Sequence, residues 1–333
     1  MVFEPSPDGV GGVGAVHVVA AGSGSQNRGI WYVTNGSGQW IAERLTTLPT
    51  GSADREEYDG EPSIALAADG SVWIAFTRWE CRECAPNPSE GVFVMGNPSG
   101  SWSDPVRVAK AQSNSPSLDA RDGAVHLAYA FGMLPVPGPE EYPTFYGTDA
   151  GGGWTFREVA GNADYPQLSV GPDGLVQVLH LNMGVRLATA ESPSSAFAVE
   201  SVYGDGNEWG PLLGTDTDGR PVAAWTSVAN ENEVFYSSRF SGSWSPPVAV
   251  MDGVLQGLVV DGAGTAHLIA SSEAGGLVYT IGRDAFAEPV SLFAGDATRA
   301  AMAVDPSGRP HVTFTVGSPP GERGIWYMAG TGD

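Results

Sequence analysis

The sequence contains little lysine, little cysteine and no long apolar run. Lys110 is the only lysine, and 16 basic residues face 38 acidic ones, so the net charge is −22. Such a surface repels phosphate backbones, whose attraction supplies most non-specific nucleic-acid binding. No apolar run reaches the roughly 18 residues of a membrane span, and residues 1–20 lack the pattern of a signal peptide. We therefore expect neither nucleic-acid binding nor membrane insertion.

The two cysteines, Cys81 and Cys84, stand close together in the sequence. A single such pair cannot complete a tetrahedral zinc site, and a thioredoxin-like role would need a βαβ context that is missing. A disulfide within the loop, two free thiols, and a metal or redox site all remain open. We expect no cofactor and no metal, with Ca²⁺ the one ion that so acidic a chain could hold. The acidity also fits an extracellular setting.

Helical patterning is also missing, because no stretch keeps a helical spacing of apolar residues for more than about two turns. Forty-six glycines and 25 prolines punctuate the chain evenly, as in proteins with many short strands joined by tight turns. A chain of 333 residues is too long for one ordinary sandwich core. The sequence therefore predicts an all-β protein that either has two domains or is one large domain built from repeats.

Three marks recur in phase along the whole chain. The first is a strand after a turn, at residues 16–18, 72–74, 125–127, 176–178, 222–224, 266–268 and 310–312. The second is an aromatic-rich strand, at residues 30–32, 92–94, 145–146, 185–187, 234–236, 277–279 and 325–327. The third is an aromatic residue after a further turn: Trp40, Trp102, Trp154, Phe197, Trp244 and Phe286. One more strand per copy lies between these marks, which gives four strands, A to D.

Four antiparallel strands per copy define the blade of a β-propeller. The turns between strands A and B carry Asp-Gly at 69–70, 122–123, 173–174 and 218–219. This dipeptide suits a type I′ hairpin turn. The sequence therefore predicts a seven-bladed β-propeller of four-stranded antiparallel blades, with residues 1–333 as a single domain.

The closure of the ring is less determined, because residues 328–333 are too few for an outer strand in blade seven. Phe3-Glu4-Pro5 looks like the start of the outer strands at 102–105 and 286–289. Residues 1–13 could close blade seven or form a poor A strand for blade one. We expect residues 2–6 to close blade seven, and the alternative is a last blade of three strands.

Four histidines occupy equivalent positions in different copies: His17, His126, His267 and His311. Residues that converge on one site should differ between blades, so we expect one packing or hydrogen-bonding role for all four. His180 lies outside this pattern, and it is kept as a minor catalytic candidate.

The turn Asp149-Ala150-Gly151-Gly152-Gly153-Trp154 has the D-x-G-x-x-W core of the Asp box, and degenerate copies end at Trp40, Trp102 and Trp244. The chain therefore resembles the sialidase-like Asp-box (BNR-repeat) propellers and is similar to seven-bladed bacterial lectins. The resemblance implies that these turns are structural and lie away from the active face. It does not imply sialidase activity, since the Arg-Ile-Pro motif is absent. We expect all four tryptophans to be buried between blades.

In a propeller the D–A and B–C loops share one face around the channel, and function usually resides on such loops. Aromatic side chains beside carboxylates and arginines suit a sugar, whose apolar face stacks while its hydroxyls form hydrogen bonds. The predicted ligand-binding residues are Tyr58, Asp59, Arg78, Trp79, Trp209, Glu233 and Arg299.

These features predict a glycan-binding or glycan-processing propeller that acts as a monomer. Binding is favoured slightly over hydrolysis or lysis because no convergent catalytic set is visible, so enzymatic activity stays open. Arg299 or Arg78 would add specificity for an acidic glycan. The alternative is a protein-interaction or structural propeller within a larger secreted or particle-associated assembly.

Overall fold

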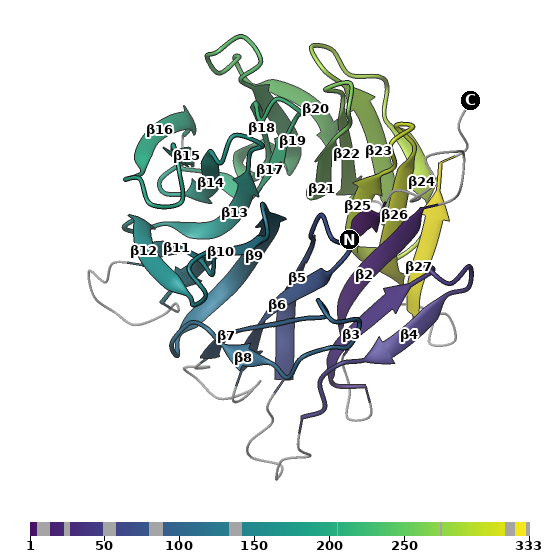
Figure 1. Ribbon diagram of the computed structural model, residues 1–333. Coiled ribbons are helices and arrows are strands. Elements are labelled where there is room, and N and C mark those ends of the chain that lie inside the picture. Colours follow the sequence, from purple (N-terminus) through teal and green to yellow (C-terminus); the bar gives the residue numbers. More distant parts are fainter. Residues whose placement is uncertain are drawn as a thin grey trace.

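The computed structural model describes residues 1–4, 14–22, 27–48, 58–79, 89–132, 142–204, 206–273, 275–316 and 324–330. Within these ranges the chain forms seven antiparallel sheets arranged around a central axis as a seven-bladed β-propeller (Figure 1). Six sheets have four strands in chain order, and the seventh has three. The predicted fold class is confirmed.

The strands of blades one to four are β1 (Val2–Glu4), β2 (Ala15–Gly22), β3 (Gly29–Thr34), β4 (Ile41–Arg44), β5 (Tyr58–Leu66), β6 (Val72–Trp79), β7 (Ser89–Gly96), β8 (Val106–Arg107), β9 (Ser113–Arg121), β10 (Ala124–Phe131), β11 (Thr144–Thr148), β12 (Thr155–Ala160), β13 (Asp164–Val170), β14 (Val176–Leu181), β15 (Val185–Ala190) and β16 (Ala198–Tyr203). Those of blades five to seven are β17 (Glu208–Thr215), β18 (Pro221–Ser227), β19 (Glu233–Ser238), β20 (Val248–Asp252), β21 (Val254–Val260), β22 (Ala266–Ser271), β23 (Leu277–Gly282), β24 (Val290–Phe293), β25 (Ala297–Val304), β26 (Pro310–Val316) and β27 (Gly324–Ala329). A 3₁₀ turn, η1 (Val228–Asn230), is the one helical element in the described ranges, and no helix there is long and apolar enough to cross a membrane.

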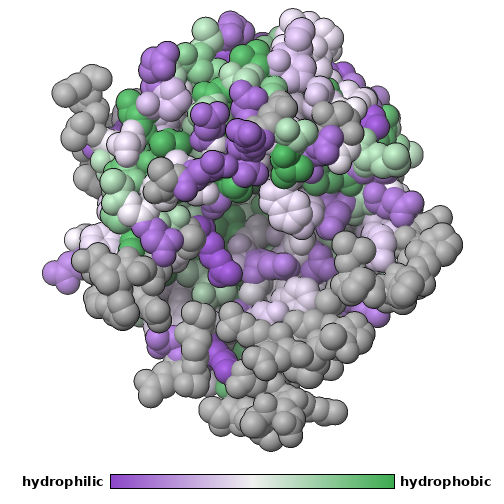
Figure 2. Space-filling view, turned by 180° about the vertical axis from the view of Figure 1, so that it is seen from behind, coloured by the Kyte–Doolittle hydropathy of each residue, from purple (hydrophilic) through white to green (hydrophobic). Residues whose placement is uncertain are grey.

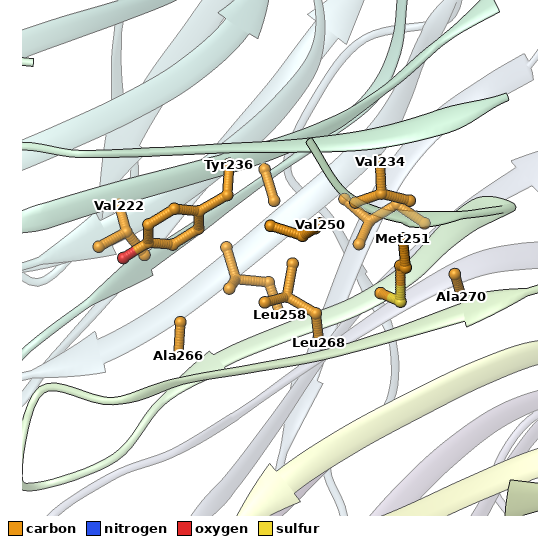
Figure 3. Packing of buried hydrophobic residues seen from close by; sticks show 11 residues of the cluster. Val222, Val234, Tyr236, Val250, Met251, Leu258, Ala266, Leu268 and Ala270 are labelled. Atoms are coloured by element: carbon orange, nitrogen blue, oxygen red, sulfur yellow. The ribbon is translucent and has the colours of Figure 1, made fainter. Parts of the chain in front are cut away.

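The core lies between neighbouring blades, whose sheets pack face to face. Between blades five and six, Val222 and Tyr236 from one sheet pack with Leu258 and Leu268 from the next (Figure 3). Strand β18 is buried along its whole length, because the second strand of a blade is covered on both faces. Burial of these apolar side chains is the main force that holds the blades together.

The four Asp-Gly turns form where the sequence predicts them, although only one is the predicted type I′ hairpin turn. Asp122 and Gly123 both have positive φ, at 53° and 75°, as a type I′ turn requires. In the turns that contain Gly70, Gly174 and Gly219, only the glycine is left-handed, and its N–H donates to the carbonyl three residues earlier. The type I′ prediction is therefore wrong for these three turns, which are longer and place one glycine in the left-handed region.

The Asp-box-like turns have the expected structural role. The side-chain oxygen of Asp149 accepts a hydrogen bond of 2.7 Å from the backbone N–H of Val125, at the start of β10. Asn35 and Asn97 do the same for Val16 and Val72, near the starts of their blades' second strands. Each such turn therefore ties the outer part of a blade to its second strand.

The four equivalent histidines share one role, as predicted. Each is buried and makes a hydrogen bond through Nδ1 with the tyrosine hydroxyl of the third strand in its blade. The pairs are His17–Tyr32, His126–Tyr146, His267–Tyr279 and His311–Tyr327. The repeated histidine is therefore a structural element of the blade.

The prediction of buried tryptophans holds only in part. Trp102, Trp154 and Trp244 are partly buried, and each packs against a cluster of core residues. Trp40 is 44 % exposed, and its ring lies 4.8 Å from that of Tyr327 in blade seven. It stays exposed because no fourth strand of blade seven covers it within the described residues.

The predicted closure by residues 2–6 is wrong. Strand β1 pairs with β2, with Val2 opposite His17 and Glu4 opposite Ala15, so it is the inner strand of blade one. Within the described part of the chain, blade seven has three strands, as the alternative prediction has it. The pairing of β1 with β2 is expected, because strands adjacent in sequence commonly pair. In Figure 1, β1 lies near the centre of the ring, beside β2 and β25.

Candidate functional site

A cavity of about 560 Å³ lies at the loop-bearing end of the channel, within the size range of ligand pockets. Blades seven, one and two line it. Its lining residues are Val19, Ala20, Ala21, Gly22, Arg28, Tyr58, Asp59, Gly60, Glu61, Pro62, Trp79, Arg299 and Thr315. Figure 2 shows the molecule from behind the view of Figure 1, with a hollow near the middle of that face and hydrophilic side chains around it.

The cavity is located where the inner strand of blade one is short. In blade two, β5 pairs with β6 up to Tyr58 opposite Trp79. In blade one, β1 pairs only with residues 15–17 of β2. Residues 19–22 of β2 therefore have no inner strand beside them in the described chain, and they form one wall of the cavity.

Tyr58 and Trp79 form an aromatic wall. They face each other as a cross-strand pair at the end of β5 and β6. Their rings stack with centroids 6.0 Å apart and an angle of 10° between the planes. Both side chains are partly exposed, so flat apolar surface is available to a ligand at this point.

Asp59 supplies a buried carboxylate behind this wall, being only 1 % exposed. Arg78 donates to Oδ1 from Nε at 2.7 Å and to Oδ2 from Nη2 at 3.1 Å, and the Thr46 hydroxyl donates to Oδ2 at 2.6 Å. The guanidinium of Arg78 also lies 4.6 Å from the centre of the Phe93 ring. Arg78 therefore neutralises and orients Asp59, and it does not line the cavity.

Glu61 and Arg299 are the exposed charged residues of the cavity at its two sides. Glu61 Oε2 accepts hydrogen bonds of 2.9 Å from the Thr77 hydroxyl and from the backbone N–H of Ser115. Arg299 forms no ion pair with any residue in the described ranges. A ligand in the cavity would therefore meet a positive group whose charge is not already compensated.

The structure brings together four of the seven predicted residues, since Tyr58, Asp59, Trp79 and Arg299 all line the cavity. Trp209 lies in blade five, outside the lining, and is 47 % exposed. Glu233 begins β19 opposite Ser227 and is also outside the lining.

His180, the minor catalytic candidate, is fully buried in β14, away from the cavity lining. Its imidazole has no side-chain hydrogen-bond partner among the described residues, and burial lowers its pKa from 6.5 to about 4. The cysteine pair lies outside the described residues. Within them no group of three or more acidic, histidine or cysteine residues could hold a metal ion.

The sequence-based set of ligand-binding residues missed Arg28, Glu61 and Thr315, which also line the cavity. Arg28 and Thr315 belong to blades one and seven, and no sequence feature places them beside blade two. Glu61 had a signal, because it precedes Pro62, and Pro116 and Pro166 recur at the equivalent point inside the inner strands of the next two blades.

No family model and no curated protein sequence matches this chain. Solved structures are similar to it. An ulvan lyase described as a polysaccharide lyase superposes with a TM-score of 0.59 at 12 % identity, over 94 % of this chain and 89 % of that one. The Hadza microbial sialidase Hz136 gives 0.53 at 10 % identity, over 90 % and 73 %. A protein of unknown function from Dyadobacter fermentans gives 0.57 at 13 % identity, over 82 % and 94 %. At these identities the likeness is one of fold, so this chain is a seven-bladed β-propeller that shares its architecture with glycan-processing propellers.

Proposed function

We propose that this protein binds glycans in the cavity between blades seven, one and two, and that its ligand is an acidic sugar chain outside the cell. One observation carries the proposal. The stacked pair Tyr58–Trp79 stands beside the carboxylate of Glu61 and the guanidinium of Arg299 in a single cavity, with the buried carboxylate of Asp59 behind it. An aromatic face for stacking, with acceptors and donors next to it, meets the needs of a sugar ring.

Although the chain as a whole is strongly acidic, the local charge at Arg299 favours an acidic sugar. Asp59 is neutralised by Arg78, whereas Arg299 lines the cavity without an ion pair to any described residue. A carboxylate or sulfate of the ligand would form a charge-assisted pair with Arg299. The similarity of fold to a sialidase and a polysaccharide lyase supports this choice without determining it.

Binding is placed ahead of bond cleavage. Both oxygens of Asp59 already accept hydrogen bonds from Arg78 and Thr46. General acid–base catalysis needs a group that exchanges its proton with the substrate. A carboxylate that is held in this way serves better to position the wall than to transfer a proton.

A glycan array, probed with and without Ca²⁺, tests the proposal together with Trp79→Ala. We expect this variant to lose measurable binding while its melting temperature stays nearly unchanged, because Trp79 is partly exposed at the end of β6. Trp40→Ala is the matched control, since it removes an exposed indole that does not line the cavity. Undiminished binding by Trp79→Ala would place the site elsewhere.

The second candidate is a protein-interaction propeller. It is favoured by exposed apolar side chains in blades one and seven: Trp40, Ile41, Ile325 and Trp326. Such patches mark interaction surfaces in many proteins. Absence of any bound glycan on the array would reject the first function and leave this one.

A further inference from the structure

Five blades place a left-handed residue at the same point of their inner strand. The φ values are 51° at Glu61, 52° at Ser115, 52° at Tyr165, 54° at Gly210 and 53° at Arg299. In each blade this residue lies where the pairing between the first and second strands shifts register. These five residues, which we call the bulge ring, therefore recur around the channel mouth.

Four of the five positions in the bulge ring carry residues for which a left-handed backbone is unfavourable. A left-handed φ costs free energy for every residue except glycine, and blade five shows that glycine is accepted there. The other four blades carry glutamate, serine, tyrosine and arginine instead. Such bulges commonly turn a side chain towards a functional site, and retained strain clusters at ligand-binding positions.

Contacts join the bulge ring to the cavity. Arg299 and Glu61 line the cavity from blades seven and two. Glu61 then accepts a hydrogen bond from the backbone of Ser115 in blade three. In blade four, burial raises the pKa of Tyr165, and the charges of Asp164 and Glu61 raise it further, so the Glu61 carboxylate lies within electrostatic reach of Tyr165.

Tyr165 belongs to a second aromatic pair. Its ring lies 4.8 Å from that of Trp209, in an edge-to-face arrangement at 62°. Trp209 precedes Gly210 on β17 and is 47 % exposed. Asp164 lies beside this pair, where its carboxylate accepts a hydrogen bond of 2.8 Å from the Tyr165 N–H. The pair has the same make-up as the first site, namely two aromatic rings beside a carboxylate.

We propose that Tyr165 and Trp209 form a second sugar subsite, and that the ligand is an oligosaccharide that crosses the channel mouth from an acidic unit at Arg299 to a further sugar at Trp209. This inference rests on the proposed glycan-binding function. Glu61 and Ser115 lie between the two aromatic pairs and offer hydrogen-bonding groups to the sugars that pass over them. A single sugar would fill only one of the two subsites.

The test is an array of uronate-containing, sulfated and sialylated glycans, each present as a disaccharide and as a hexasaccharide. The wild-type protein should bind hexasaccharides at least about tenfold more tightly than disaccharides of the same composition. Trp209→Ala should lose this gain and keep disaccharide binding, whereas Trp79→Ala should lose both. Trp40→Ala, which removes an indole of similar exposure on the outer rim, should behave as wild type.

The failures are distinguishable. Equal affinity for long and short chains, or a Trp209→Ala variant that keeps the gain with length, would overturn the second subsite and leave the first intact. Absence of binding to every glycan would overturn the proposed function and this inference with it. Circular dichroism of Trp209→Ala confirms that the variant is folded, which its exposed position leads us to expect.

Discussion

Removal of one hydroxyl from equivalent tyrosines in blades three and five should have different effects on stability. In blade three, the Tyr146 hydroxyl makes a hydrogen bond of 2.6 Å with Nδ1 of His126. In blade five, Tyr236 occupies the same place, but Val222 stands where the histidine would be. The buried hydroxyl of Tyr236 makes no hydrogen bond within the described residues, although Ser238 lies nearby.

The magnitudes follow from what each substitution leaves behind. Tyr146→Phe leaves Nδ1 of His126, which is only 3 % exposed, without its partner. An orphaned buried polar group costs about 1–3 kcal/mol. Tyr236→Phe removes a buried polar atom that has no partner, so we expect an unfolding free energy within about 0.5 kcal/mol of wild type, or above it.

Equilibrium unfolding in guanidinium chloride measures both variants against wild type. The comparison is valid where the denaturant dependence of the three proteins is the same, because the midpoint shift then reports stability alone. Equal losses for the two variants would refute the reasoning. A larger loss for Tyr236→Phe would show that its hydroxyl has a partner that the structure does not reveal.

Two further changes test the fold. Trp154→Ala should cost about 2–4 kcal/mol, since this indole is partly buried on the core between blades two and three, whereas Trp40→Ala should cost roughly 1 kcal/mol or less. Denaturant midpoints in the reverse order would contradict the observed packing. Stability should fall as the pH drops below 6.5, because buried His180 stays neutral in the folded protein down to about pH 4 while the unfolded chain takes up the proton. Between pH 7 and pH 5 this group accounts for about 2 kcal/mol of the unfolding free energy. His180→Leu should therefore lose about that much less unfolding free energy than wild type between the two pH values. An equal loss in the two proteins would mean that His180 is protonated in the folded state.

The number of blades and the part played by the four repeated histidines could be predicted from the sequence, because both depend on local features. A tight turn, a strand and a cross-strand neighbour are set by residues close together in the chain. Each His–Tyr pair joins neighbouring strands of one blade, so its recurrence in phase predicted a shared structural role. The same holds for Tyr58 and Trp79, which lie at the ends of the paired strands β5 and β6.

The candidate site was only partly predictable, because its members come from blades far apart in the sequence. Arg78 and Arg299 have the same chemistry and both lie near the loop-bearing face. The structure separates them, since Arg78 is paired with Asp59 behind the wall, while Arg299 lines the cavity from blade seven. No pattern within either segment shows which arginine faces an acid of the same protein.

Taken alone, the sequence determined the all-β class, the seven copies and the turn and histidine positions that build each blade, since short-range geometry imposes them. Only the tertiary structure decided that residues 2–4 join blade one, that Trp40 stays exposed, and that the cavity lies beside residues 19–22 of β2. These outcomes depend on how the first and last blades meet when the ring closes. That contact joins residues at opposite ends of the chain, and only packing in three dimensions brings them together.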